Sequence, residues 1–168
     1  MKKFLILIVF ITAVISVSAQ QINNDVFHME LPSGTAQLSA QAKQQRPNDT
    51  MLAGATGNIY SKNNLVLSYR VNQDIKATSH SLEVLQEQQQ YLFGNMANTV
   101  VVGSEIVTYG KVRFLLTRTH SNEGECITFT SEHNGRYAYM YGKLKFPAAD
   151  KTEADAYLTS LLGSFKYN

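Results

Sequence analysis

The chain has 168 residues with 15 Lys or Arg and 13 Asp or Glu, which gives a formal net charge of +2. Its basic residues form no cluster that could follow a phosphate backbone and no polybasic patch, which disfavours binding to nucleic acids and to membrane surfaces. A chain of this length suits one domain with its own hydrophobic core.

The N-terminus has the pattern of a secretory signal peptide. Residues 1–3 are Met-Lys-Lys, residues 4–17 are apolar apart from one Thr and one Ser, and small residues end at Ala19. The apolar run of about 14 residues is shorter than the ~20 that span a bilayer. We therefore expect cleavage before Gln20, a periplasmic or secreted protein, and no stable membrane insertion afterwards; an uncleaved anchor is the alternative. Loss of residues 1–19 leaves 13 basic and 13 acidic residues, a net charge near zero.

The mature chain begins with short polar and strand-like segments. Residues 20–25 are expected to be a flexible lead-in to a single domain over residues 26–168. A first strand is predicted over residues 26–31, where Pro32-Ser33-Gly34 ends it. The Gln- and Ala-rich stretch 36–46 fits either a short helix or a loop.

Two further strands are predicted before the first long helix. Residues 52–60 form a weak strand pattern, because two glycines interrupt it. Residues 65–71 alternate clearly, and Lys62-Asn63-Asn64 predicts the turn between the two strands. One face of the second strand carries Leu65, Leu67, Tyr69 and Val71, and the other carries Val66, Ser68 and Arg70.

A helix is predicted from residue 82 to residue 96. Thr78, Ser79 and Ser81 are candidate N-caps. Apolar residues then recur at helical spacing, which predicts a helix packed on a sheet. These apolar positions are Leu82, Leu85, Leu92, Phe93 and Met96.

Four antiparallel strands are predicted over residues 100–107, 111–119, 126–131 and 136–145. The chain ends with a helix in which Asp150 and Glu153 predict a capping box. Its apolar stripe is Ala154, Tyr157, Leu158, Leu161 and Leu162, Gly163 is the expected end, and Phe165 and Tyr167 can add a short strand. The predicted fold class is therefore α+β: a single antiparallel sheet of about six to seven strands with two main helices packed on it.

Asn134-Gly135 predicts a two-residue hairpin turn, which places Thr130 opposite Tyr139 and Thr128 opposite Tyr141. Because side chains alternate along a strand, Ile127, Phe129, Ala138 and Met140 are expected in the core. The other face carries Cys126, Thr128, Thr130, Tyr137, Tyr139 and Tyr141. If this face is open, Tyr137, Tyr139, Tyr141, Thr128 and Thr130 form a candidate patch for a protein, peptide or glycan partner; a covering helix is the alternative.

The single cysteine, Cys126, raises the question of catalysis. A thiol nucleophile needs a base at roughly 3 Å. His133 lies about 20 Å along the same strand and turn, on the opposite face, and His120 lies across a turn. His28 and His80 are remote in sequence. We therefore expect a small apolar role for Cys126 and no catalytic residue, with a secreted hydrolase or thiol enzyme that uses Cys126 or His120 as the alternative.

The candidate metal ligands are His120, Glu123, Glu125 and His133, and their spacing matches no zinc motif. We expect no metal site and no cofactor.

The order of strands, helix, four strands, helix and short strand resembles the PsbP-like family of small α/β/α sandwiches. The segments that carry the resemblance are NNLVLSYRV at 63–71, the turn and strand YGKVRFLL at 109–116, and the closing AYLTSLLGSFKYN. These segments indicate packing contacts and turns, so the resemblance assigns no functional residue to this chain. The resemblance implies a non-catalytic accessory or binding domain that serves a larger assembly.

The sequence therefore favours an exported, non-enzymatic binding or accessory domain with a protein or peptide partner in the cell envelope. A small-molecule or lipid carrier, with the ligand between sheet and helix, is a further alternative.

Overall fold

The structure, a computed structural model, describes residues 20–39, 58–73, 81–134 and 138–168. The predicted signal peptide at 1–19 lies outside these residues. So do most of the Gln- and Ala-rich stretch, most of the weak strand at 52–60, His80 and Tyr137.

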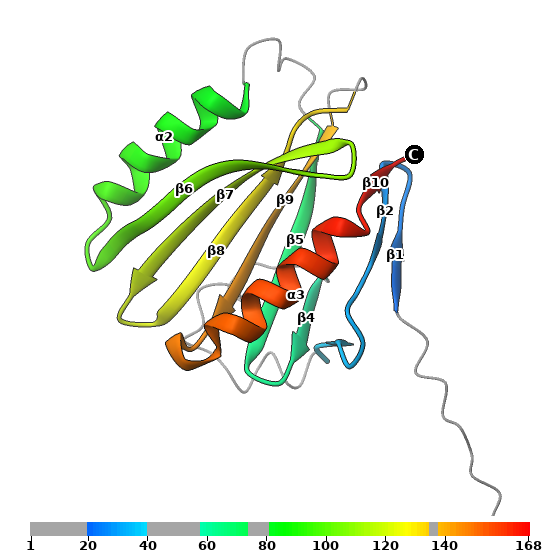
Figure 1. Ribbon diagram of the computed structural model, residues 1–168, viewed down its shortest axis with the longest axis horizontal. Coiled ribbons are helices and arrows are strands. Elements are labelled where there is room, and N and C mark those ends of the chain that lie inside the picture. The colour runs from blue at the N-terminus through cyan, green and yellow to red at the C-terminus, as the bar shows by residue number, and fades with distance from the viewer. Residues whose placement is uncertain (1–19, 40–57, 74–80, 135–137) are drawn as a thin grey trace, which may run out of the picture.

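Seven strands form one large antiparallel sheet in the order β3-β4-β5-β9-β8-β7-β6 (Figure 1). The long hairpins predicted over residues 100–145 account for four neighbouring strands in this order. The fold class predicted from the sequence is confirmed. The strands are β3 (Ala36–Gln37), β4 (Ile59–Lys62), β5 (Leu65–Gln73), β6 (Thr99–Tyr109), β7 (Val112–Ser121), β8 (Gly124–Ser131) and β9 (Ala138–Phe146).

A second, three-stranded sheet joins the two ends of the domain. It contains β1 (Gln21–Asn23), β2 (Phe27–Glu30) and β10 (Lys166–Tyr167), with β2 in the centre. The expectation of a flexible lead-in at residues 20–25 is wrong, because Ile22 is buried and pairs with Met29. One apolar residue in a polar stretch is too short a pattern to predict a strand.

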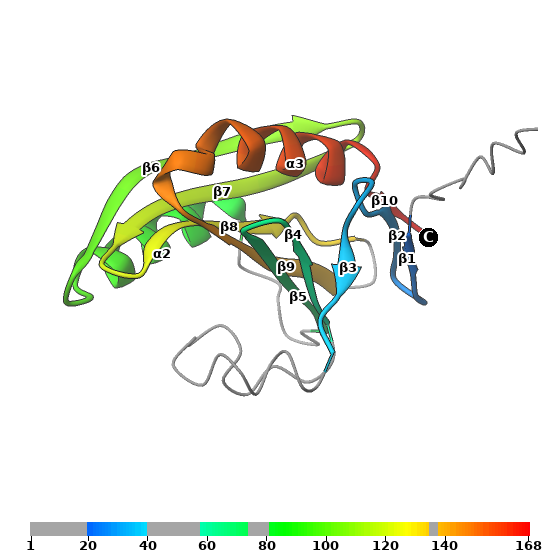
Figure 2. The same cartoon turned by 90° about the horizontal axis from the view of Figure 1, so that it is seen from below.

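Two helices cover opposite faces of the large sheet. They are α2 (Leu82–Gly94) and α3 (Lys151–Gly163), the latter preceded by the short 3-10 helix η1 (Ala148–Asp150). Figure 2 shows α3 on one side of the sheet and α2 on the other. Side-chain contacts of β7 agree with this placement of the helices. Thr117 bonds Gln89 of α2 and the next residue, Arg118, bonds Asp155 of α3, and successive side chains of a strand point to opposite faces.

The hydrophobic core lies between α3 and the face of the sheet that we call the core face. The apolar stripe predicted for this helix is confirmed, since all five of its residues are buried. Side chains from β7, β8 and β9 meet it, and among the largest fully buried ones are Phe114, Phe129, Met140 and Leu144.

The predicted capping box at the start of α3 is wrong. Asp150 makes no side-chain capping hydrogen bond. Its carboxylate instead accepts a hydrogen bond from the Asn64 amide at 3.0 Å, and that of Glu153 accepts one from Asn63 at 2.7 Å. Asn63 has a positive φ of 51°, the left-handed conformation that asparagine tolerates in turns. The two acidic residues therefore tie the β4–β5 turn to the helix.

The helix α2 packs differently from its predicted apolar stripe. Its N-cap is Ser81, whose Oγ accepts the Val84 N–H at 3.3 Å. Leu82 is buried, but Leu92 is 61% exposed and Met96 is 53% exposed. The inner side of the helix is partly polar: Gln86 donates to the Ser104 carbonyl, and the Gln89 side-chain oxygen accepts the Thr117 hydroxyl, both at 2.8 Å. The predicted packing of this helix on a sheet is confirmed, but its stripe is only partly covered because the sheet beneath α2 is itself polar.

The ion pair between Arg118 and Asp155 predicts a pH dependence of stability. Burial raises the pKa of Asp155, but hydrogen bonds from Lys151 and Arg118 outweigh it and hold this pKa below its usual value. A lowered folded-state pKa stabilises the fold above the unfolded pKa of about 3.9, and this stabilisation is lost as the pH falls through the folded pKa. Asp155→Asn should therefore lower the free energy of unfolding at pH 7 by about 0.5 kcal/mol, since both side chains are partly exposed.

Urea denaturation of the Asp155→Asn variant and the wild type at pH 7 and pH 3 checks this. The difference should shrink at pH 3, and Asp25→Asn, at an exposed aspartate, serves as the control. An equal loss at both pH values would contradict an ionic origin.

Candidate functional site

The sheet face opposite the core face is lined by polar and aromatic side chains, and we call it the polar face. The helix α2 packs mainly over its β6–β7 end. The polar face carries Thr117 and Thr119 on β7, Cys126, Thr128 and Thr130 on β8, Tyr139, Tyr141, Lys143 and Lys145 on β9, and Ser68 and Arg70 on β5.

The predicted register of the β8–β9 hairpin is wrong by two residues. Thr130 pairs with Tyr141, not with Tyr139. The connection is longer than a two-residue turn: the Asn134 N–H donates to the Ala138 carbonyl, and the Ala138 N–H donates to the Asn134 side-chain oxygen. A shift of two preserves the alternation of faces. The predicted core face of this hairpin is therefore correct.

The predicted partner-binding residues fall into two groups. Tyr139 and Tyr141 are half-buried on β9. Thr128 and Thr130 are each only 2% exposed, so they belong to a buried polar layer and do not form an open patch. The Thr128 hydroxyl donates to the Thr117 carbonyl at 3.3 Å, whereas the Thr130 hydroxyl is buried without a hydrogen-bond partner. Tyr137 lies outside the described residues.

A cation lies against one of the two described tyrosines of this face. The exposed Arg70 guanidinium lies 4.9 Å from the ring centroid of Tyr141, within cation–π range. Burial raises the pKa of Tyr141 to about 12, so its hydroxyl stays protonated at neutral pH. The Tyr139 ring packs edge-to-face on His133, with centroids 4.8 Å apart. Alternation along residues 65–71 had placed Arg70 on the outer face, but only the β5–β9 pairing brings it to Tyr141.

The register separates Cys126 from the nearest histidine in sequence. Cys126 pairs with Thr119, and both lie on the polar face, so His120 lies on the opposite face. There the His120 Nδ1 is 2.7 Å from the Glu125 carboxylate. The arrangement does not combine Cys126 and His120 into a nucleophile–base pair.

The four candidate metal ligands are also separated. His120 contacts Glu125, whereas Glu123 pairs with Lys145 at 3.0 Å. His133 follows the far end of β8, about 25 Å along the strand from Glu125. Within the described ranges, no group of three or more His, Cys, Asp or Glu side chains gathers as a possible metal site.

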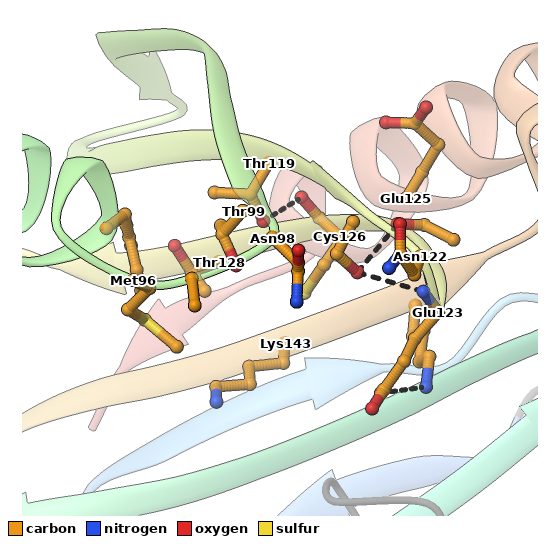
Figure 3. Close-up of a pocket in the computed structure, with 15 residues that line it drawn as sticks. Met96, Asn98, Thr99, Thr119, Asn122, Glu123, Glu125, Cys126, Thr128 and Lys143 are labelled. Carbon is orange, nitrogen blue, oxygen red and sulfur yellow. Dashed lines mark hydrogen bonds and ion pairs between the residues drawn. The ribbon is translucent and has the colours of Figure 1, made fainter.

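A cleft of about 580 Å³ lies between the C-terminal end of α2 and the polar face (Figure 3). Residues that follow α2 form one wall, and β7, β8 and β9 form the other. The lining includes Phe93, Met96, Asn98, Cys126, Thr128 and Lys143. No pattern in the sequence had indicated this cleft, because one wall comes from residues 93–99 and the other from residues 119–145.

No protein-family model and no curated protein matches the chain. Among solved structures it is similar to the solution structure of cyanobacterial PsbP (CyanoP) from Synechocystis sp. PCC 6803. The TM-score is 0.56 at 10% sequence identity, over 93% of this chain and 96% of that chain. The resemblance to the PsbP-like family is thereby confirmed at the level of the fold. In the part of the chain that the structure describes, no helix is long and apolar enough to cross a membrane.

Proposed function

We propose that the protein is an exported, non-enzymatic binding or accessory domain that binds a protein or peptide partner of the cell envelope through Tyr139, Tyr141 and Arg70. The signal-peptide pattern of residues 1–19 supports export. The PsbP-like fold and the separation of Cys126 from His120 support a binding role over catalysis.

The observation that carries the proposal is the contact between Arg70 and Tyr141 beside Tyr139. Arg70 and Tyr141 are direct partners on paired strands, and Tyr139 follows on the same face. Tyrosine and arginine are enriched among the residues that dominate binding energy at interfaces. A tyrosine ring also contributes apolar contact area and a hydroxyl at little entropic loss. An extended peptide with an acidic residue opposite Arg70 suits this surface.

Affinity capture from the protein's own cell envelope, after crosslinking, tests the proposal. The wild type should capture a stoichiometric partner, and the mass of the purified protein should correspond to a chain that begins at Gln20. Tyr141→Ala and Tyr139→Ala should each reduce capture about tenfold, as expected for residues at the centre of an interface. Tyr91→Ala, which removes a 74% exposed tyrosine from α2, is the matched control and should capture normally.

Thermal unfolding of each variant distinguishes lost binding from lost folding. Equal capture by all three variants would overturn the site. A wild type that captures no partner would overturn the binding function itself.

A further inference from the structure

We propose that the cleft between the end of α2 and the polar face binds a small amphiphilic carboxylate. The Lys143 ammonium would contact the carboxylate group, and Phe93 and Met96 would contact the apolar part of the ligand. This site adjoins the tyrosine surface proposed above, but Tyr139 does not line it.

The charge balance of the cleft favours a monoanion. Two lysines of β9, Lys143 and Lys145, face it. Lys145 pairs with Glu123 at 3.0 Å. No acidic side chain of the described residues pairs with Lys143, whose nearest aromatic contact is the Tyr141 ring centroid at 6.0 Å, the limit of cation–π range. Lys143 is half-buried, and a charge pair at a partly buried position is screened less by solvent than one at an open surface.

The acidic residues of the cleft argue against a dianion. Figure 3 shows the Glu125 carboxylate pointing away from Lys143, toward the side of the sheet where His120 holds it at 2.7 Å. Glu123 remains at the rim beside Lys145. A second negative charge on the ligand would meet the Glu123 carboxylate, and the only other cation among the described residues of the lining is Lys145, which pairs with Glu123. A carboxylate therefore fits better than a doubly charged phosphate ester.

The wall formed by the end of α2 and the residues that follow it is apolar and adaptable. Phe93 is half-buried, and Met96 is 53% exposed although its side chain is hydrophobic. Methionine fits irregular apolar shapes because its chain is unbranched and its sulfur polarisable. The side chain of Asn98 adds hydrogen-bonding capacity beside this wall (Figure 3). The cleft volume of about 580 Å³ lies in the range of small-molecule sites.

Octanoate, octyl phosphate and octanol are the probes that test this proposal. The protein is purified from cells that express the full chain and is titrated by calorimetry. The methyl NMR signal of Met96, assigned with a Met96→Leu variant, reports the location. Octanoate should bind at sub-millimolar concentration and shift this signal. Lys143→Gln should weaken octanoate binding about tenfold, as for loss of a charged hydrogen bond. Lys111→Gln, at an exposed lysine of the β6–β7 turn, is the matched control and should bind like the wild type.

Four results would overturn the proposal: no octanoate binding by the wild type, equal losses in Lys143→Gln and Lys111→Gln, an unchanged Met96 signal, or octanol binding as tightly as octanoate. Tighter binding of octyl phosphate would overturn the carboxylate class. Tyr139→Ala distinguishes this proposal from partner capture, because it should reduce capture and leave octanoate binding intact.

Discussion

Replacement of Gly142 by alanine is expected to lower the free energy of unfolding by about 3 kcal/mol, the upper end of the range for overpacked cores. Gly142 of β9 pairs directly with Phe129 of β8. A Cβ at Gly142 would lie 2.2 Å from the Phe129 Cζ and 2.3 Å from its Cε2, far inside contact distance. The Phe129 ring is fully buried and has no open space to move into. Urea denaturation measures the loss.

Two further variants make the Gly142 prediction specific. Gly103→Ala is the matched control, because it adds the same methyl group to a strand glycine with no atom within 4 Å. Its effect should stay below about 0.5 kcal/mol. Gly142→Ala combined with Phe129→Leu should recover part of the loss, since the smaller side chain leaves the ring's position vacant. A Gly142→Ala protein as stable as the wild type would refute the close approach. Gly142 lies between Tyr141 and Lys143, so its packing also positions both proposed sites.

Replacement of Phe165 by alanine is expected to lower the free energy of unfolding by about 3–5 kcal/mol. Phe165 is 3% exposed and lies at the centre of an aromatic cluster. Its ring centroid is 4.9 Å from that of Phe27, 5.3 Å from that of Phe114 and 5.0 Å from that of Tyr167. These rings belong to β2, β7 and β10, so the cluster joins the small sheet to the large one. Loss of the ring removes contacts on both sides at once.

The controls for Phe165 use a conservative change and a distant one. Phe165→Leu keeps most of the apolar volume and should lose less than half as much stability as Phe165→Ala. Tyr91→Ala, at a 74% exposed ring, should stay within about 0.5 kcal/mol of the wild type. If Phe165→Ala behaved like Tyr91→Ala, the small sheet would be held independently of this cluster.

The two proposed sites lie on the same sheet face but differ in shape and chemistry. At the β5–β9 side, rings and a guanidinium lie against one another, which suits a macromolecular partner. At the end of α2, a hollow lined by Lys143, which no acidic side chain of the described residues pairs, suits a small ligand. The helix α2 contacts the sheet partly through polar groups. Its Gln86 side chain bonds the Ser104 carbonyl of β6, and its Gln89 side chain bonds the Thr117 hydroxyl of β7. Its outer surface exposes Leu92, so α2 lacks the tight apolar packing that holds α3.

Local sequence patterns determined most of the secondary structure. Alternation along residues 65–71 and 126–131 placed the correct side chains in the core, and the stripe of α3 is buried as predicted. These patterns are readable because the periods of strand and helix are set by backbone geometry within a few residues. The same reasoning succeeded only in part for α2, which packs on the sheet as predicted but leaves Leu92 and Met96 exposed because the sheet beneath is polar. A helical stripe shows which side of a helix is apolar, but it carries no information about the surface that the helix meets.

Side-chain alternation in the sequence is enough to separate the core face from the polar face, because alternation survives even a register error of two residues. Which groups meet on the polar face depends instead on the tertiary structure. The pairing of β5 with β9 brings Arg70 to Tyr141 across 70 residues of chain, and the return of α2 over β7 forms the cleft above Lys143. The β1 strand likewise depends on β2 for its burial. Such contacts join segments that are distant in the chain, and the energy that selects them comes from the packing of the whole sheet rather than from any local pattern.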